Sequence, residues 1–387
     1  MLRPNSFTRG ILAVVLCFAL TQVAAGRIIY VDADAPGRNS GLSWADAFTD
    51  LRDALLMARP GDEIRVAPGV YTPAAPPNGK RGDSFLLQEA QGATIRGGYA
   101  GFGEPDPDAR DIVKYRTILS GDLNGDDGLN FANNGENSYH VIDSSSTNEL
   151  TILDGFTITG GNADSRIHLE PPYVGWEEAV GGGIYNIGGS PTIIDCNFIA
   201  NFALEGGGGM YNAPNHPSAG EPPIPSNPKL IHCKFTKNSA DFGSGIYNEN
   251  SSPVLNCCGF IANRASYGGG MFINYRGSIV LTSCIFNGNE ATLGGGMLIY
   301  DSNATLINCT FKSNSASNFA GGIHNVMAAT TLTNCILWAN TDSSGMYESA
   351  QIYGGTPNIN YCCVQGWSIK QLNEGHKYLF KPIVCRL

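Results

Sequence analysis

The chain has 387 residues and a formal charge of −10, and only 15% of its residues are charged, where about 25% is usual. Glycine accounts for 49 residues, well above its usual share of roughly 7%. Low charge, abundant glycine and short apolar runs favour an extended all-β protein over a helical domain. The acidic balance argues against nucleic acid as a partner, because phosphate backbones would be repelled.

The N-terminus has the pattern of a secretory signal peptide. Arg3 and Arg9 precede an apolar run at 11–20, and Val23-Ala24-Ala25 supplies the small residues that a signal peptidase reads. We therefore expect residues 1–25 to be removed and the mature chain to be secreted, or held at the cell surface or outer membrane. No later run is long and apolar enough to span a bilayer, so we expect no transmembrane span after cleavage.

Residues 26–165 are expected to form an N-terminal cap and the first coils of a β-stack. A capping box at Ser43 and Asp46 precedes apolar residues with helical spacing, and Pro60-Gly61 is a stop signal; these apolar residues are Trp44, Phe48, Leu51 and Leu55. The pattern predicts one helix that covers the open edge of the first coil. The expected strands of this region lie at 28–31, 63–67, 93–97, 117–120, 139–143 and 150–159.

Two motifs alternate through the second half of the chain. The pattern C-x-F-x-x-N occurs six times, with Leu337 in place of phenylalanine in the last copy, and begins at Cys196, Cys233, Cys258, Cys284, Cys309 and Cys335. A glycine-rich motif, G-G-x-[IM] in most copies, lies between these at the same period and begins at 181, 207, 243, 268, 294 and 321. Residues 154–159 are interpreted as a degenerate first copy, with Asp154 and Phe156 in the cysteine and phenylalanine positions.

Most steps between these cysteines are 25 or 26 residues, which suits one coil of a parallel β-helix. Equivalent residues of successive coils then stack at about 4.8 Å. We expect an interior column of cysteines, a second column of phenylalanines and a ladder of asparagines at a corner. Glycines supply the positive φ and close approach that sharp corners need.

The F-x-x-N and G-G-[AG]-[ILM] motifs of residues 181–340 resemble the repeats of the polymorphic outer-membrane protein family. That family is surface-exposed and belongs to the broader pectin-lyase-like architecture. The resemblance implies an all-β, right-handed parallel β-helix, with its repeat core at 166–345 and a last coil and divergent tail at 346–387. It does not imply an activity, because this architecture carries lyases, hydrolases, adhesins and inert stalks.

Cysteines of the predicted column are interpreted as free, buried packing residues, because in-register parallel side chains rarely reach the geometry of a bridge. A disulfide or metal role for the column is the alternative. The better candidates for disulfides are Cys257, which would point outward, and Cys362, Cys363 and Cys385 near the C-terminus.

One acidic segment suggests a calcium site. Asp122, Asn124 and Asp126 place oxygen-bearing side chains at every second position, as calcium loops do. The pattern departs from the EF-hand form, since Asn133 stands where that loop has glutamate. The alternative is a polar turn rich in Asx residues. No other cofactor is expected.

The insertion at 164–180 carries candidate ligand-binding residues. Tyr173, Trp176, Glu177 and Glu178 combine aromatic rings with carboxylates, as sugar sites do. The alternative is an ordinary solvated loop, because adjacent glutamates are poorly placed as an acid–base pair. A second insertion at 213–228 is also a candidate recognition loop.

Three outward aromatic residues of the repeat core, Tyr275, Tyr300 and Trp338, are either ordinary strand residues or the lining of a sugar groove. The only arginines of the repeats at 181–340, Arg264 and Arg276, accompany no obvious acidic cluster. The sequence therefore favours a non-catalytic, exported β-helix used for adhesion, binding or structure, with a polysaccharide or cell-surface component as partner. The alternative is a polysaccharide lyase or glycoside hydrolase.

Overall fold

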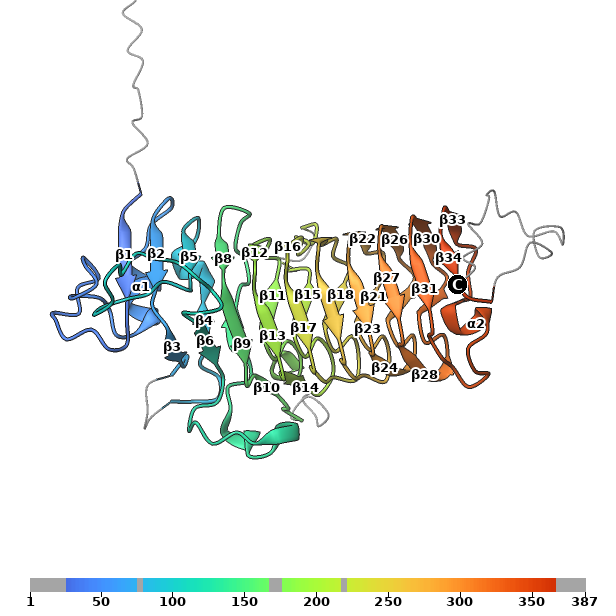
Figure 1. Ribbon diagram of the computed structural model, residues 1–387, viewed down its shortest axis with the longest axis horizontal. Coiled ribbons are helices and arrows are strands. Elements are labelled where there is room, and N and C mark those ends of the chain that lie inside the picture. The colour runs from blue at the N-terminus through green and yellow to red at the C-terminus, as the bar shows by residue number, and fades with distance from the viewer. Residues whose placement is uncertain (1–25, 75–78, 167–175, 217–220, 367–387) are drawn as a thin grey trace, which may run out of the picture.

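The computed structural model describes residues 26–74, 79–166, 176–216 and 221–366. These residues wind into one stack of coils, and each coil contributes strands to long parallel sheets that run along the stack (Figure 1). The expected signal peptide, the ligand candidate Tyr173 and the disulfide candidate Cys385 lie outside the described residues.

Three sheets form the walls of the stack, and every pair of neighbouring strands in them is parallel. Sheet A has the order β1 (Ile28–Val31), β2 (Glu63–Val66), β5 (Thr94–Arg96), β8 (Ile152–Asp154), β12 (Thr192–Ile194), β16 (Lys229–Ile231), β19 (Val254–Asn256), β22 (Ser278–Thr282), β26 (Asn303–Ile307), β30 (Ala329–Thr333) and β33 (Asn358–Asn360). Sheet B has the order β3 (Gly69–Tyr71), β6 (Thr117–Ser120), β9 (Phe156–Thr159), β13 (Asn197–Ile199), β17 (Lys234–Thr236), β20 (Gly259–Ile261), β23 (Ile285–Asn287), β27 (Thr310–Lys312), β31 (Ile336–Trp338) and β34 (Cys363–Val364). Sheet C has the order β4 (Phe85–Leu86), β7 (Ile142–Asp143), β11 (Ile184–Ile187), β15 (Met210–Ala213), β18 (Ile246–Glu249), β21 (Met271–Asn274), β25 (Met297–Tyr300), β29 (Ile323–Val326) and β32 (Ile352–Tyr353).

Shorter elements lie in the turns and at the ends of the stack. Two pairs of short strands line the turn between sheets B and C, namely β10 (Asn162–Ala163) with β14 (Phe202–Ala203), and β24 (Glu290–Leu293) with β28 (Ser315–Phe319). The helices are α1 (Leu51–Met57) and α2 (Glu348–Gln351), with short 3-10 helices η1 (Leu87–Ala90), η2 (Leu129–Phe131), η3 (Asn134–Glu136) and η5 (Trp176–Ala179). None of the described helices is long and apolar enough to cross a membrane.

The predicted interior columns are present. The rings of Phe198, Phe235, Phe260, Phe286 and Phe311 are fully buried and stack along the axis with centroids 4.4 to 5.0 Å apart. The cysteines form a parallel column of free, buried thiols, which confirms the packing interpretation. Each thiol donates to a carbonyl of the preceding coil, as Cys233 Sγ does to Ile193 O at 3.4 Å.

The asparagine ladder is a continuous hydrogen-bonded chain. Asn289 Nδ2 donates to the Asn314 Oδ1 of the next coil at 2.8 Å and to the Phe260 carbonyl at 2.9 Å. Its Oδ1 accepts from both the backbone and the side chain of Asn263. The same pattern runs from Asn201 to Asn340, and all six side chains are at most 1% exposed. Every buried amide of the ladder therefore has partners on the coils before and after it.

The first and the third glycine of the repeated motif are each required, but for different reasons. The first glycine of most copies has a positive φ, for example +65° at Gly268 and +66° at Gly294. The third glycine lies against the phenylalanine column, and a Cβ at Gly270 would come within 2.8 Å of the Phe286 ring. The motif therefore combines a left-handed corner with a close approach that only glycine permits.

The expected N-terminal helix is present but shorter than predicted. It begins at Leu51, where Asp50 accepts a hydrogen bond from Arg52 N, and not after Ser43. Asp46 N does donate to Ser43 Oγ at 3.2 Å, yet Phe48 forms a β-bridge with Val31 instead of continuing into a helix. In this segment the backbone of Phe48 pairs with the edge of β1, so the residues do not form the helix that their apolar spacing predicted.

The degenerate first copy is shifted by two residues from its predicted register. Ile158 pairs with Phe198, so Ile158 takes the phenylalanine position and Phe156 the cysteine position. Gly161 N donates to Asn201 Oδ1 at 3.0 Å, as each ladder asparagine does to the next. A shift of two residues keeps every side chain on its original face, so apolar patterning alone does not fix this register. The strand predicted at 150–159 is divided into β8 and β9 by Gly155.

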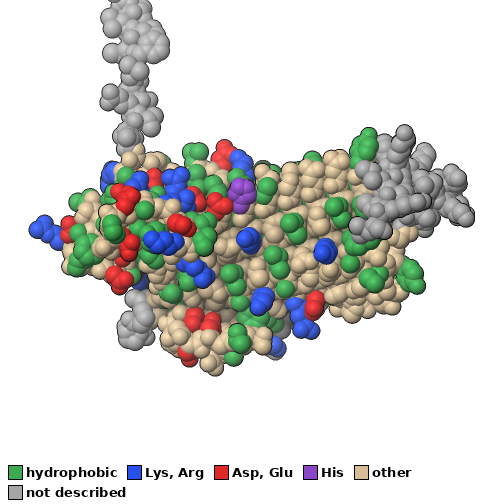
Figure 2. Space-filling model, viewed as in Figure 1, with side chains coloured by type: hydrophobic (Ala, Val, Ile, Leu, Met, Phe, Trp, Pro, Cys, Tyr) green, Lys and Arg blue, Asp and Glu red, His purple; other side chains and the backbone are tan. Residues whose placement is uncertain are grey.

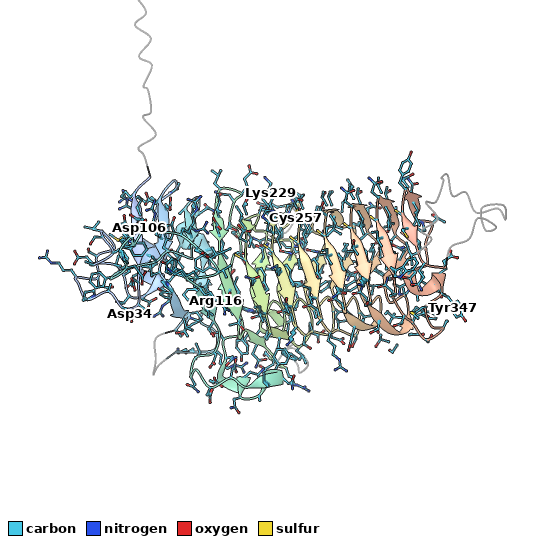
Figure 3. The ribbon with its side chains drawn as sticks, in the orientation of Figure 1. Asp34, Asp106, Arg116, Lys229, Cys257 and Tyr347 are labelled. Carbon is cyan, nitrogen blue, oxygen red and sulfur yellow. The ribbon has the colours of Figure 1, made fainter. Side chains whose placement is uncertain are left out.

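Two of the proposed disulfide cysteines have other roles. Cys362 is free and buried, and it continues the cysteine column, because Cys335 N donates to Cys362 Sγ at 3.3 Å. Cys257 is free and exposed at the outer edge of the stack, where Figure 3 labels it. Cys363 is disulfide-bonded, as predicted. The disulfide prediction was therefore wrong for both: Cys257 points outward as expected but is free, and Cys362 takes a column position that is recognisable only once the last coil is placed.

Candidate functional site

A groove lined by aromatic side chains runs along the outside of sheet C. Its floor consists of Tyr247, Phe272 and Leu298, which are register partners on the neighbouring strands β18, β21 and β25. Its volume is about 540 Å³, within the range of ligand sites. We call it the aromatic groove.

Two walls border this floor. Phe242, Tyr267 and Leu293 form the wall on the side of the turn from sheet B, and consecutive β-bridges connect them. The opposite wall contains residues at or just after the ends of the sheet C strands, namely Asn274, Tyr275, Tyr300 and Val326. Among the described residues that line the groove, none carries a charge. The lining therefore offers apolar surface with hydroxyl and amide groups at its edges.

Asn274 and Tyr247 form a polar pair in this lining. Asn274 Nδ2 donates to the Tyr247 hydroxyl oxygen at 3.0 Å, while Asn274 Oδ1 is buried without a hydrogen-bond partner. The Asn274 residue is only 8% exposed. Burial raises the pKa of Tyr247, so its hydroxyl keeps its proton as a donor. Asn274 Oδ1 is enclosed, so the Tyr247 hydroxyl is the group of this pair that can donate to a ligand hydroxyl.

The aromatic row of the floor continues toward the N-terminal coils. The Tyr211 and Tyr247 rings lie 5.3 Å apart, and Trp176 of η5 packs edge-on against Tyr211 at 5.5 Å. Tyr211 is fully buried and donates to Glu249 Oε2 at 2.8 Å. Trp176, one of the predicted ligand residues, is 41% exposed and therefore extends the aromatic surface beyond the groove.

The two glutamates next to Trp176 differ in exposure. Glu177 is exposed and Glu178 is half-buried on the short helix η5, and the Glu178 carbonyl accepts from Ser165 N at 3.3 Å. Neither residue lines the aromatic groove. Of the three outward aromatics singled out in the sequence, the structure brings Tyr275 and Tyr300 together in the groove, whereas Trp338 lies on sheet B.

The predicted calcium loop folds into an acidic cluster with one unforeseen member. Carboxylate oxygens of Asp122, Asp126 and Glu136 all lie within 4.8 Å of one another. Asn124, the other predicted ligand, is exposed, as Asp126 is. Glu136 Oε1 is buried without a hydrogen-bond partner. Glu136 belongs to η3, ten residues after Asp126, and no local spacing in the sequence pointed to it.

Electrostatics in this cluster favour an added positive charge. Burial, with repulsion from Asp126 and Asp122, raises the pKa of Glu136, and burial also raises the pKa of Asp127 nearby. Asp122 at the same time accepts backbone hydrogen bonds from Gly125 and Asp127, which is the polar turn given as the alternative. The oxygens present suit a hard cation such as calcium, and calcium binding stays a prediction.

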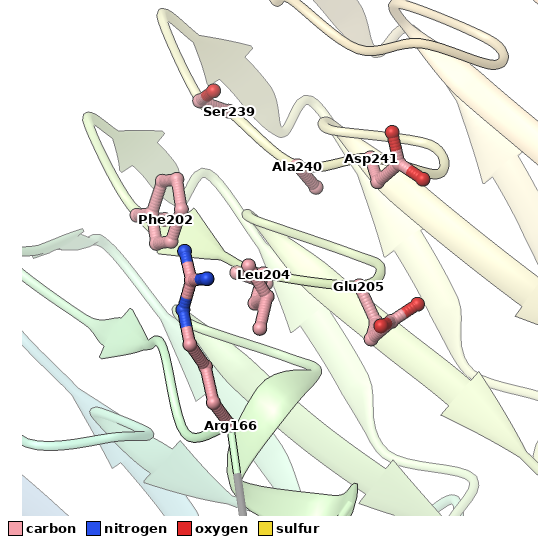
Figure 4. A pocket seen from close by; sticks show the side chains of 8 residues that line it. Arg166, Phe202, Leu204, Glu205, Ser239, Ala240 and Asp241 are labelled. Atoms are coloured by element: carbon pink, nitrogen blue, oxygen red, sulfur yellow. The ribbon is translucent and has the colours of Figure 1, made fainter. Parts of the chain in front are cut away.

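A second, charged cleft lies beside β14. Arg166, Phe202, Leu204, Glu205 and Asp241 are among its lining residues, and its volume is about 340 Å³. Figure 4 shows the Arg166 guanidinium beside the Phe202 ring, with the two carboxylates further along the cleft. Phe242 N donates to the Glu205 carbonyl at 2.7 Å, so Glu205 and Asp241 lie on consecutive coils.

Comparison with known proteins agrees with this geometry. Residues 176–337 match the model of the family described as "Right handed beta helix region". The chain contains a right-handed parallel β-helix. The right-handed parallel β-helix predicted from the sequence is therefore confirmed. The match does not distinguish polymorphic outer-membrane protein repeats from other right-handed β-helices, so the narrower resemblance stays an expectation.

Solved structures resemble this β-helix only distantly. The pectate lyase Pel9A has a TM-score of 0.40 and 14% identity over 87% of this chain and 83% of its own. A pectin methylesterase from carrot has a TM-score of 0.38 and 12% identity over 93% of this chain and 89% of its own. Likenesses at this level carry no information about a shared activity. Among curated proteins, none matches this sequence.

Proposed function

We propose that this protein is an exported, surface-associated β-helix that binds polysaccharide in the aromatic groove without cleaving it. The observation that carries the proposal is the lining of the groove, which combines tyrosine and phenylalanine rings with tyrosine hydroxyls and no described charge. Sugars match such a surface, because their ring C–H groups are apolar and their edges carry hydroxyls.

The same lining argues against cleavage in this groove. Glycoside hydrolysis uses a pair of carboxyl groups that flank the scissile bond, and no described carboxylate lines the groove. The nearest one on the strand-end wall, Glu249, accepts the hydroxyl of the buried Tyr211. Binding therefore accounts for the groove better than hydrolysis does.

A pair of matched tyrosines provides the test. Tyr275 lines the groove, whereas Tyr361 lies after β33 in sheet A and outside the groove. Each follows an asparagine, their φ values are 53° and 54°, and they are 55% and 59% exposed. Tyr275→Ala should weaken binding in a glycan-binding screen by about fivefold to tenfold. Tyr361→Ala should leave binding unchanged.

The screen should be run with an activity assay on acidic and neutral polysaccharides, with and without calcium. We expect binding with no new reducing ends and no unsaturated products. If Tyr275→Ala and Tyr361→Ala weakened glycan binding equally, the groove would not be the binding site. Absence of binding to every glycan tested would contradict the proposal.

The charged cleft supports a second candidate function, that of a carbohydrate-active enzyme. It has charged groups that the aromatic groove lacks, namely Glu205 and Asp241 on consecutive coils with Arg166 in the same cleft. Cleavage that is lost in both Glu205→Gln and Asp241→Asn, while glycan binding is retained, would establish this alternative.

A further inference from the structure

Resting on the binding function proposed above, we infer that the ligand of the aromatic groove is an uncharged, unbranched, β-1,4-linked polysaccharide that lies along the stack axis with one sugar ring over each coil. Three features of the groove support this ligand: its repeat along the stack, its lack of charge and the strand pairing of sheet C.

The groove repeats once per coil. Its floor and the wall on the side of the turn repeat on the coils of β18, β21 and β25, and its strand-end wall repeats on those of β21, β25 and β29, so together they span four coils. Adjacent coils are spaced by about 4.8 Å, and the rings follow this spacing, with centroids 5.2 Å apart for Tyr247–Phe272 and 5.1 Å for Phe242–Tyr267. This repeat is close to the length of one pyranose ring with its glycosidic oxygen in an extended chain.

A straight groove selects the shape of the polymer. In a β-1,4-linked chain the equatorial bonds hold successive rings in an extended ribbon. In an α-1,4-linked glucan the chain curls, so only one or two rings would meet equivalent positions on the wall formed by Phe242, Tyr267 and Leu293. Linkage should therefore affect affinity even where the monosaccharide is the same.

The charge of the surroundings selects a neutral chain. No described charged side chain lines the groove, so a carboxylate placed there would lose its hydration without gaining a cation. Glu249, the register partner of Asn274, stands at the N-terminal end of the strand-end wall and would repel an acidic polymer. On the face shown in Figure 2, charged side chains gather over the N-terminal coils, and few lie over the C-terminal coils.

The backbone of the groove argues for sugar over peptide. Strands β18, β21 and β25 are each paired on both sides within sheet C. An extended peptide would find no free strand edge, and its own N–H and C=O groups would be covered without partners. The Tyr247 hydroxyl, whose oxygen already accepts from Asn274 Nδ2, keeps a proton that it can donate to a sugar oxygen.

A length series of soluble oligosaccharides tests the register. Calorimetric titration of the mature protein with cello-oligosaccharides of two to six units should show affinity that rises with each unit up to four and then levels off. Affinity should not change between low and high salt, because no charge pairing contributes. Malto-oligosaccharides of the same lengths should bind at least about tenfold more weakly, a difference of about 1.4 kcal/mol.

A matched acidic ligand tests the charge. Cello-oligosaccharides oxidised at C6 have the same backbone with carboxylates, and we expect them to bind at least about tenfold more weakly than the neutral series. Tyr247→Phe removes one hydroxyl and keeps the ring, and should weaken tetrasaccharide binding by about threefold to tenfold. Arg276→Ala, which removes the cation next to Tyr275 in the sequence, should change nothing.

The outcomes separate this inference from the binding function on which it rests. Binding of the neutral series that ignores length, or that levels off at two units, would overturn the one-ring-per-coil register. Equal binding of the oxidised or α-linked series would overturn the ligand class. In each case a loss of binding in Tyr275→Ala would still support a glycan site. If no oligosaccharide or polysaccharide bound, both the ligand class and the proposed binding function would be contradicted.

Discussion

Gln351 closes the asparagine ladder at its C-terminal end. Asn340 Nδ2 donates to Gln351 Oε1 at 2.8 Å, and Gln351 Nε2 donates back to the Asn340 carbonyl at 3.0 Å. Gln351 is fully buried at the end of α2, which covers the end of the stack (Figure 1). A chain of buried amides that points along the stack needs a final acceptor, and Gln351 supplies it.

Gln351→Ala should destabilise the last coils more than the rest of the stack. The change leaves the buried Asn340 Nδ2 with the Phe311 carbonyl as its one remaining acceptor, so one N–H loses its partner at a cost of about 1–3 kcal/mol. Hydrogen exchange should show faster opening of β31 and β33, with little change in β11 to β18. Uniform exchange along the stack would contradict this role.

Asn289→Ala, in the middle of the ladder, should cost more than the change at its end. The substitution removes hydrogen bonds to the coils on both sides, and we expect a loss of about 3 kcal/mol in the free energy of unfolding. Urea unfolding measures it. Asn303→Ala is the control, because Asn303 is exposed at the start of β26. A similar loss of stability in Asn303→Ala would show that an asparagine of the ladder contributes no more than an exposed one.

Thiol labelling should distinguish Cys257 from the cysteine column. Burial raises the pKa of Cys196 to about 12, and the Cys258 thiol, with burial, raises the pKa of Cys284 to about 12. In the native protein we expect a thiol reagent to modify Cys257 alone among the described cysteines. Denaturation should expose the others.

Cys257→Ser should abolish native labelling while keeping the thermal midpoint. Cys284→Ser should keep the labelling and lower the stability, because a hydroxyl replaces a buried, weakly polar thiol. Rapid native labelling of the column would contradict the packing described here.

Calcium should stabilise the loop that holds Asp122, Asp126 and Glu136. Because the pKa values of Glu136 and Asp127 are raised mainly by burial, the folded state takes up their protons before the unfolded state does. Their contribution to stability therefore falls as the pH rises above the ordinary values of 4.5 and 3.8. At neutral pH a hundredfold excess of calcium over its Kd should raise Tm by roughly 5 °C.

Glu136→Gln tests whether calcium acts through this cluster. The variant should be at least as stable as the wild type without calcium, since it removes one of the crowded carboxylates, and it should lose most of the calcium-dependent rise in Tm. Glu104→Gln, which changes an exposed carboxylate elsewhere, should keep the full rise. A rise that survives in Glu136→Gln would exclude the cluster as the calcium site.

His324 should make the protein less stable in mild acid. Burial lowers the pKa of His324 below its ordinary value of 6.5, and its Nδ1 has no hydrogen-bond partner. The unfolded chain therefore binds a proton before the folded chain does, so stability is full above pH 6.5 and falls as the pH drops below it. His324→Tyr restores the residue found in earlier repeats and should flatten this pH dependence.

Denaturant unfolding at a series of pH values measures the difference between His324→Tyr and the wild type. The two curves should run parallel above the ordinary histidine pKa and separate below it. Parallel curves throughout would show that His324 is protonated freely in the folded state.

The regular parts of the fold were predictable because each depends on a motif that occurs many times in the sequence. Six copies of C-x-F-x-x-N placed the cysteine and phenylalanine columns and the ladder correctly. Predictions failed where a single segment stood alone, as at Ser43, where a β-bridge replaced the helix, and at Phe156, where the register moved by two residues.

The functional surfaces depended on contacts between different coils. Tyr275 and Tyr300 were noticed as outward aromatics, but Phe242, Tyr267 and Asn274 were not, because nothing local distinguishes them from other turn and strand residues. Glu136 joins Asp122 and Asp126 only after the loop folds back on itself.

By itself, the sequence determined the coil, its period and the residues of its interior, because stacking identical positions along an axis is the way such repeats bury their apolar faces. The tertiary structure alone decided the aromatic groove and the acidic cluster. Both are formed by residues from separate coils or turns, and their meeting depends on register and loop path, which residue types along the chain do not encode.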